Sequence, residues 1–420
     1  MIIRQISDPF VQLETSQPAL WLKVRPVLGR IKRKCFSWLE PKPSPPSPVL
    51  GYTGGASGPI HKRALLIYLL SAFPKTAEEI RRAPINTVQS LEIARALNRL
   101  GYIVDAVDWQ DSAFVPQQHY DVCFGMHYNY GRLLPMLKSR KTINIYYATG
   151  AYWKFENEAE AARSDYLLKR RGIDIRLPER LIANNWVQDS EAIVALGDGF
   201  NEALYTPHNK RVFSIDHVAV PSSTPPNFEA KDFSGSVRQN FLCIVGTGLL
   251  HKGVDLVLEA FTGLPDYHLW LCGGLHPALE EEFLRAYRKE LFYTPNIHPV
   301  GIVDRPALNH LSEMCVASVH ASCSESQATS VLDTMVRGLV PLVTRESGVS
   351  TERFGMTFKD GTVEEIRRSV AEMANTSATE CRRMAEGAYQ TAITRYTLDR
   401  YVHNIEEILR KILKDDDPLR

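Results

Sequence analysis

The chain has no apolar run long enough to cross a membrane and no recognisable export signal. Near its start the longest apolar run is Ala64 to Leu70, whereas a membrane-spanning helix needs roughly 20 apolar residues. The first residues also lack the basic-then-apolar order of a signal peptide. We therefore expect a cytoplasmic protein.

An excess of basic charge and a cysteine framework are also missing. The 49 Lys and Arg residues balance 48 Asp and Glu residues, for a net charge of +1. Nucleic-acid-binding domains are usually strongly basic, so we expect no nucleic-acid partner. The seven cysteines are dispersed without a Cys-x-x-Cys pair, which argues against a disulfide framework and against a zinc site.

What is present is typical of a soluble globular protein, with 44% apolar and 23% charged residues. At 420 residues the chain is too long for a single ordinary core. Short apolar segments without polar alternation are separated by segments of helical length, which indicates parallel sheets covered on both faces. The strands that we expect cover 64–70, 102–107, 120–125, 143–147, 193–196, 241–245, 268–272, 297–300, 316–322 and 341–344. The helices that we expect cover 88–100, 253–261, 279–291, 306–315, 328–337 and 398–414.

Changes in composition divide the chain into five parts. These are an N-terminal arm and Pro/Gly-rich linker over 1–60, a Rossmann-like domain over 61–220, a linker over 221–237, a second Rossmann-like domain over 238–395, and a C-terminal helix over 396–420 that could pack back on the first domain. Within the arm, residues 20–38 mix aromatic, aliphatic and basic side chains. Two interpretations stay open for this stretch: contact with an anionic membrane surface, or a disordered arm that touches little.

Two carboxylates and one lysine are the candidate functional groups of the second domain. Glu325 follows the strand expected at 316–322, and Asp333 lies eight residues later in the next helix. The loop after the domain's first strand contains Gly246, Gly248 and Lys252. Glycines permit close backbone approach, and a lysine there suits a diphosphate as a point charge. The alternative is that all three charged side chains are ordinary surface or capping groups.

Taken together, these residues resemble the retaining glycosyltransferases of family 4, which have the GT-B fold of two Rossmann-like domains facing across a cleft. The resemblance rests on Lys252-Gly-Val-Asp255, the pair Glu325 and Asp333, the turn Gly338 to Pro341, and Gly348. It covers residues 240–350 well, 61–220 loosely and 1–60 not at all.

The resemblance implies roles for individual residues. Lys252 would hold the donor diphosphate, Glu325 would contact the donor sugar, and Asp333 would bind the ribose. Further donor contacts would come from the glycine-rich loop and from backbone N–H groups at the helix start, namely Gly246, Thr247, Gly248, Ala328, Thr329 and Ser330. His127 would position the reaction from across the cleft and counts, with Lys252 and Glu325, as catalytic; its alternative is a packed core histidine. No metal or cofactor is implied.

The sequence departs from the family at several positions. Thr247 stands where the family has arginine, Asp333 where it has glutamate, and Ser326-Gln-Ala328 where it has Gly-Phe-Gly. The first domain lacks the usual Gly-Gly loop. At the end of its strand over 143–147, the segment Tyr147 to Trp153 could form an acceptor surface or belong to the core.

The implied activity is that of a hexosyltransferase. It would move a sugar from a nucleotide-diphosphate sugar to the hydroxyl of an unknown glycan, lipid or small-molecule acceptor, with retention, in glycan or polysaccharide assembly. Two alternatives remain: a scaffold of the same fold that has lost turnover, which the departures at Thr247 and Asp333 favour, and a nucleotide-sugar epimerase.

Overall fold

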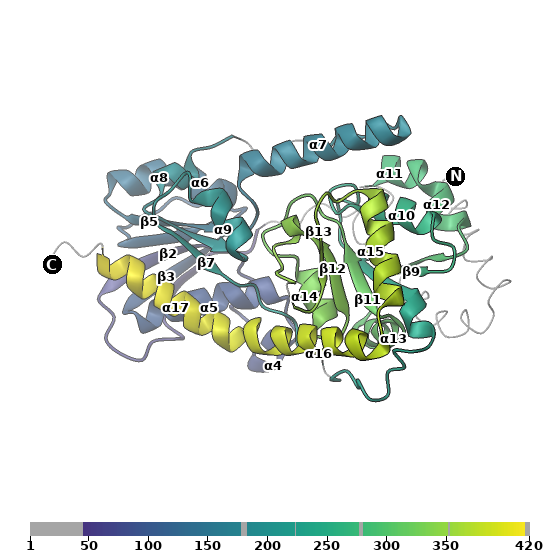
Figure 1. The fold of residues 1–420 in the computed structure, drawn as a ribbon. Coiled ribbons are helices and arrows are strands. Elements are labelled where there is room, and N and C mark those ends of the chain that lie inside the picture. Colours follow the sequence, from purple (N-terminus) through teal and green to yellow (C-terminus); the bar gives the residue numbers. More distant parts are fainter. Residues whose placement is uncertain (1–44, 178–182, 223, 277–279, 352, 416–420) are drawn as a thin grey trace.

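In the computed structural model, which describes residues 45–177, 183–222, 224–276, 280–351 and 353–415, the chain forms two α/β domains side by side (Figure 1). The stretch at 20–38, for which membrane contact was considered, lies outside the described residues. No helix in the described ranges is both long and apolar enough to cross a membrane.

The first domain contains a seven-stranded sheet in the order β1-β3-β2-β4-β5-β6-β7. All neighbouring pairs are parallel except β1 with β3. The strands are β1 Val49–Tyr52, β2 Lys62–Tyr68, β3 Tyr102–Asp108, β4 Val122–Gly125, β5 Ile143–Ala148, β6 Ala192–Leu196 and β7 Val212–Ile215. The helices are α4 Ala77–Arg81, α5 Ile85–Arg99, α6 His127–Ser139, α7 Trp153–Arg171, α8 Trp186–Asp189 and α9 Gly199–Tyr205.

The second domain contains a six-stranded, fully parallel sheet in the order β10-β9-β8-β11-β12-β13. The strands are β8 Asn240–Val245, β9 His268–Gly273, β10 Ile297–Gly301, β11 Ala317–His320, β12 Val340–Thr344 and β13 Met356–Phe358. The helices are η2 Ser236–Gln239, α10 Val254–Thr262, α11 Glu281–Ala286, α12 Arg288–Tyr293, α13 Arg305–Met314, α14 Thr329–Met335, η3 Arg345–Ser347, α15 Val363–Asn375 and α16 Ala378–Arg395, followed by α17 Leu398–Asp415. The predicted fold class, two Rossmann-like domains, is therefore confirmed.

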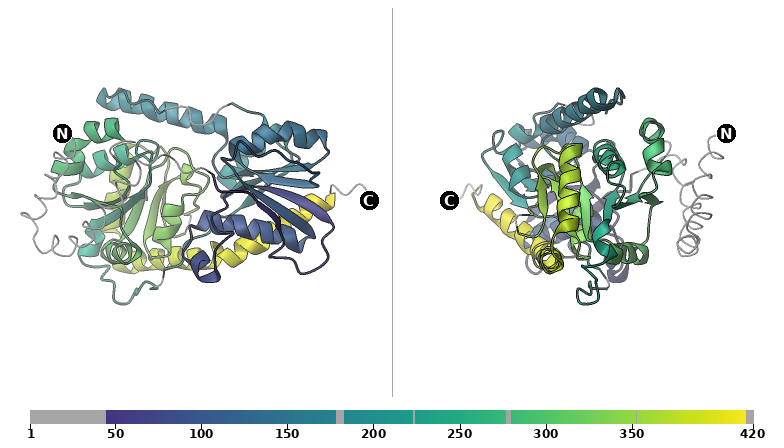
Figure 2. Two further views of the ribbon diagram at one scale, coloured as in Figure 1. Left: turned by 180° about the vertical axis from the view of Figure 1, so that it is seen from behind. Right: turned by 45° about the vertical axis from the view of Figure 1, so that its right-hand side comes forward.

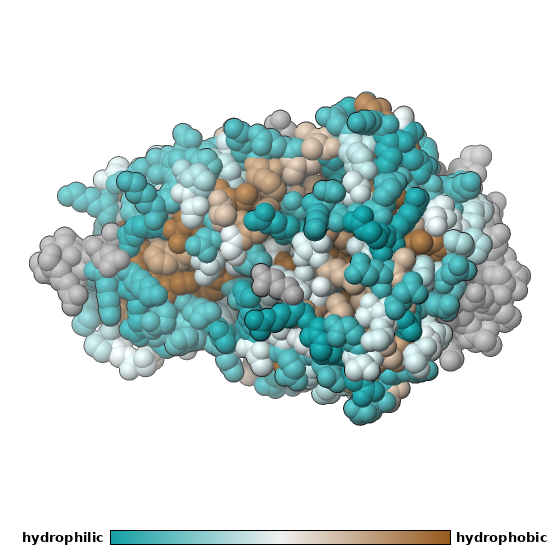
Figure 3. Space-filling model, in the orientation of Figure 1, coloured by the Kyte–Doolittle hydropathy of each residue, from teal (hydrophilic) through white to brown (hydrophobic). Residues whose placement is uncertain are grey.

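Two helices pass from one domain to the other on opposite sides of the molecule (Figures 1 and 2). Helix α7 leaves the first domain after β5 and lies over the second domain, whose core includes Leu167. Helix α17 follows α16 and returns to the first domain, where Tyr401, Ile405 and Leu409 belong to the core around the sheet. On the face drawn in Figure 3, hydrophilic residues dominate and apolar ones gather on the first domain's side.

Several stretches differ from the sequence-based expectations, among them α6, α15, α16, β7 and β13, which were not expected. Residues 49–52 were placed in a flexible linker, but they form β1, because Val49 and Tyr52 pack on the first domain's core. The single helix expected over 279–291 is divided into α11 and α12 at Tyr287. The 19-residue helix α7 was not expected at all.

Candidate functional site

The loop between β8 and α10 carries the candidate lysine and is shaped by glycines. The Lys252 N–H donates to the Gly248 carbonyl at 2.8 Å, which closes a turn. Gly253 follows with a φ of +71°, and a Cβ there would lie 2.1 Å from the Ala321 carbonyl oxygen. Only glycine fits this position, so the loop with Lys252 lies directly against the loop that follows β11.

Lys252 and Glu325 are brought together by these two loops. The Lys252 ammonium donates to Glu325 Oε1, and His320 Nε2 lies 3.4 Å from the same oxygen. Burial would raise the pKa of Glu325, but Lys252 and the His320 hydrogen bond outweigh it and hold that pKa well below its usual range. Glu325 is therefore a permanent carboxylate, and the site pairs one fixed negative charge with one ammonium.

The glycine-rich loop holds an anionic group of the protein itself. Backbone N–H groups of Gly248 and Leu249 donate to the carboxylate of Glu280. Gly246 and Thr247 are exposed, and a Cβ at Gly246 would meet nothing within 4 Å. Because successive N–H groups that bind a carboxylate can also bind phosphate oxygens, this loop has the properties of an anion site.

The start of α14, expected to offer N–H groups to the donor phosphates, already has one of those groups bonded within the protein. The Ala328 N–H donates to the Ser347 carbonyl at 2.8 Å, so that group already has a partner. Thr329 is exposed and Ser330 half-buried, in a helix of seven residues. Gln327, which stands at the phenylalanine of the family's Gly-Phe-Gly, accepts from the His217 N–H at 2.6 Å and thereby ties this loop to the segment between the domains.

Asp333 lies on α14 beside arginine side chains. Its carboxylate is 3.7 Å from Arg337 Nη1, and 30% of its side chain is exposed. Burial raises the pKa of Asp333, and the charges of Arg337 and Arg305 act against that rise. The side chain is thus accessible but not isolated, and a ligand hydroxyl would share it with Arg337.

His127 lies on the first domain at the start of α6, with a φ of +54°. Its Nε2 is 3.4 Å from Thr149 Oγ1, and its ring lies against Trp109 with centroids 5.4 Å apart. Burial lowers the pKa of His127 to about 4, so the imidazole is neutral at pH 7. It can exchange a hydrogen bond with a sugar hydroxyl but does not carry a charge there.

A cavity of about 150 Å³ opens beside His127. Its lining is aromatic with a few polar groups, and includes Tyr146, Thr149, Tyr152, Trp153, Glu156, Trp186 and Tyr205. Of the segment Tyr147 to Trp153, Tyr147 is fully buried, whereas Tyr152 and Trp153 line the cavity. Tyr147 therefore belongs to the core, and an acceptor surface at Tyr152 and Trp153 stays a prediction.

Sequence reasoning missed three groups of this site. His320, Glu280 and Gln327 are single polar residues without a recognisable spacing. Only the position of His320 at the end of β11 gave a signal, because ligands meet the carboxyl ends of parallel strands. Within the described ranges, no three His, Cys, Asp or Glu side chains are grouped to hold a metal ion.

Comparison with known proteins places these features in a family context. Residues 227–391 match the family model described as glycosyl transferases group 1. No curated protein sequence matches the chain.

Solved structures resemble nearly the whole chain at low identity. Sucrose-phosphate synthase from Thermosynechococcus elongatus is 11% identical with a TM-score of 0.59, over 85% of this chain and 100% of that one. HepE from Anabaena in complex with UDP-glucose is 11% identical with a TM-score of 0.55, over 84% and 100%. A glycosyltransferase from Rickettsia africae is 12% identical with a TM-score of 0.54, over 84% and 100%. The chain therefore has the GT-B fold, and its second domain matches the glycosyl transferases of group 1.

Proposed function

We propose that this protein is a glycosyltransferase that moves a sugar from a nucleotide-diphosphate sugar to an acceptor hydroxyl, with retention at the anomeric carbon. The observation that carries the proposal is the contact of Lys252 with Glu325 at the ends of β8 and β11, inside the segment that matches group 1. The bound UDP-glucose of the similar HepE structure favours a uridine nucleotide as the first donor to test.

The charges of the site suit departure of a nucleoside diphosphate. When the bond between the anomeric carbon and the phosphate oxygen breaks, negative charge develops on that oxygen. The Lys252 ammonium and the N–H groups of the loop at Gly248 would stabilise this charge. Glu325 would accept hydrogen bonds from hydroxyls of the donor sugar, since it stays ionised at every physiological pH.

The acceptor would enter from the first domain. Its hydroxyl oxygen forms the new bond to the anomeric carbon on the face that the phosphate leaves, and its proton passes to a phosphate oxygen. The cavity beside His127 offers aromatic faces for an apolar ring or for the C–H face of a sugar. The neutral His127 imidazole would orient the acceptor or donor hydroxyl by a hydrogen bond. We assign the product to glycan or polysaccharide assembly.

The proposal is tested with purified protein and a panel of UDP-, GDP- and ADP-sugars, by thermal shift and by release of the nucleoside diphosphate. Binding raises the melting temperature by mass action. We expect Lys252→Ala and Glu325→Ala each to reduce turnover by about 10²–10³-fold. Lys289→Ala, an exposed lysine of the same domain, is the matched control and should change nothing. Unchanged turnover in the Lys252 and Glu325 variants would remove the site assignment.

A second candidate is a protein that binds the nucleotide sugar without turning it over. This candidate is favoured by Glu280, whose carboxylate occupies the N–H group of Gly248 in the glycine-rich loop. A donor phosphate would have to displace that carboxylate in order to bind there. If the two compete, Glu280→Gln should tighten nucleotide binding by about tenfold, roughly 1.4 kcal/mol. Binding without any product in both wild type and variant would support the second candidate.

A further inference from the structure

Helix α7 belongs to the first domain by sequence, yet it contacts the loops that carry the donor-site charges. Its buried residues are Glu160, Arg163, Ser164 and Leu167, which lie on one helix face because they are three, four and seven positions apart. That face is directed at the second domain, because Glu160 contacts His251, Arg163 contacts Ala321 and Leu167 lies in that domain's core. Three of its four side chains are polar, so this face makes specific polar contacts beside the apolar packing of Leu167.

Two of those partners are immediate neighbours of the candidate site. Glu160 Oε1 lies 2.7 Å from His251 Nδ1, and both side chains are almost fully buried. His251 directly precedes Lys252. Arg163 Nη2 donates to the Ala321 carbonyl at 3.0 Å, and Ala321 begins the loop that leads to Glu325.

The two loops are also bonded to each other. The Cys323 N–H donates to the His251 carbonyl at 3.0 Å, and the Ser322 hydroxyl donates to the same carbonyl at 3.3 Å. Gly253 lies against the Ala321 carbonyl. The loop of Lys252, the loop of Glu325 and the middle of α7 therefore meet at one buried point.

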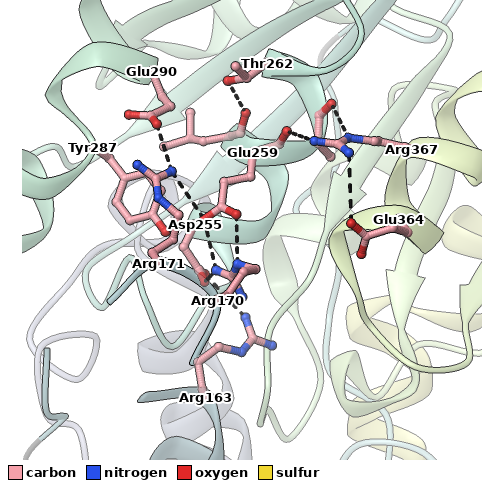
Figure 4. A network of polar contacts seen from close by, with 12 residues as sticks. Arg163, Arg170, Arg171, Asp255, Glu259, Thr262, Tyr287, Glu290, Glu364 and Arg367 are labelled. Atoms are coloured by element: carbon pink, nitrogen blue, oxygen red, sulfur yellow. Dashed lines mark hydrogen bonds and ion pairs between the residues drawn. The ribbon is translucent and has the colours of Figure 1, made fainter. Parts of the chain in front are cut away.

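The C-terminal half of α7 is fixed by an ionic network (Figure 4). Arg170 binds Asp255 at 2.8 Å and Glu259 at 2.8 Å, Arg163 lies 3.6 Å from Asp255, and Arg171 binds Glu290 at 2.9 Å. Tyr287 donates to Glu259 at 2.6 Å. Because Asp255 and Glu259 are on α10, which begins just after Lys252, this network holds the helix that the lysine loop enters.

We propose that Glu160 and Arg163 of α7 are positioning residues for glycosyl transfer, which hold the loops of Lys252 and Glu325 in place relative to each other and to the first domain. The inference rests on the proposed function. Neither residue touches the substrate; Glu160 acts through His251 and Arg163 acts through the Ala321 carbonyl. Their effect on the reaction follows from geometry, since a shift of about 1 Å in a charged group at the reacting centre can cost about 10²-fold in rate.

The test compares Glu160→Gln with Glu158→Gln, the same change at an exposed position of the same helix. Glu160→Gln keeps the side-chain volume and replaces the carboxylate that contacts His251 Nδ1 with an amide. We expect kcat to fall by about 10–100-fold in Glu160→Gln with the KM for the donor changed by less than about threefold. Glu158→Gln should behave as wild type. Arg163→Lys, which keeps the charge and shortens the reach to Ala321, should show the same division between kcat and KM.

A double variant tests whether Glu160 affects the reaction through His251. If Glu160 acts through His251, Glu160→Gln combined with His251→Gln should lose no more activity than the single variants, because the second change removes a contact that is already broken. All rates are measured at least about 20 °C below each variant's melting temperature, so that a purely structural role would leave kcat unchanged. Wild-type turnover of one of UDP-glucose, GDP-mannose or ADP-glucose, together with wild-type kcat in both α7 variants, would overturn the positioning role alone. No turnover of any donor by wild type would overturn the proposed function and this inference with it.

Discussion

The helices α7 and α17 make the same kind of connection between the domains with opposite chemistry. Helix α17 binds the first domain through apolar residues of its core, such as Ile405, Leu409 and Ile412. Helix α7 binds the second domain through ion pairs and other polar contacts, with Leu167 and the half-buried Tyr166 as its apolar contributions to that core. Apolar packing is strong but non-directional, whereas paired charges require one geometry. From this contrast we infer that α17 mainly stabilises the fold, whereas α7 fixes the position of the loops that carry Lys252 and Glu325.

The largest expected effect breaks the apolar connection. Leu409→Ala removes a fully buried side chain, and we expect the free energy of unfolding to fall by about 3 kcal/mol. Urea unfolding followed by circular dichroism measures this loss, and NaCl should hardly change it. Turnover at a temperature where the variant is folded should equal that of wild type; a large fall in kcat there would erase the distinction between the two helices.

An intermediate effect is expected at the ionic connection. Arg170→Met leaves the fully buried Asp255 with only the more distant Arg163. We expect a loss of about 2 kcal/mol in the free energy of unfolding, because removing one partner of a buried pair leaves its charge uncompensated. Arg176→Met, which breaks an exposed pair between a residue beyond the helix end and Asp165 of α7, is the control, with a loss below about 0.5 kcal/mol. Equal losses in both would show that burial does not decide the strength of the α7 pairs.

The smallest effect sharpens the comparison at a charged contact between α17 and α5. Glu406 Oε2 lies 2.6 Å from Arg99 Nε in a half-exposed setting, so Glu406→Gln should cost about 0.5 kcal/mol at pH 7. Burial would raise the pKa of Glu406, but the hydrogen bonds from Arg99 and Arg410 lower it.

A carboxylate with a lowered pKa stabilises the fold above its unfolded pKa of roughly 4.3, and that contribution is lost as the pH falls further. The difference between wild type and Glu406→Gln should therefore shrink between pH 5 and pH 3 in urea titrations. A difference that grows towards acid would contradict the assignment.

The sequence predicted the second domain better than the first. Lys252-Gly-Val-Asp255 and Glu325 are local motifs whose geometry depends on a few neighbouring residues, and the structure brings Lys252 and Glu325 into contact. Helix α7 could not be found from apolar periodicity, because its buried face is made of Glu160, Arg163 and Ser164. The partners of those residues, at His251, Asp255 and Ala321, are distant in the chain. The edge strand β1 was missed for a related reason, since Gly51 and the surrounding prolines and glycines are typical of linkers.

The return of α17 to the first domain has a consequence for biosynthesis. The first domain's core includes residues 401, 405, 408, 409 and 412, which are translated after the whole second domain. A domain normally folds as a unit, N-terminal first, while the ribosome adds roughly 5–20 residues per second. The first domain therefore cannot complete its core until the second domain has been translated, and part of its sheet stays uncovered until then. The interval before α17 arrives is the time at which this chain most needs protection by chaperones against aggregation.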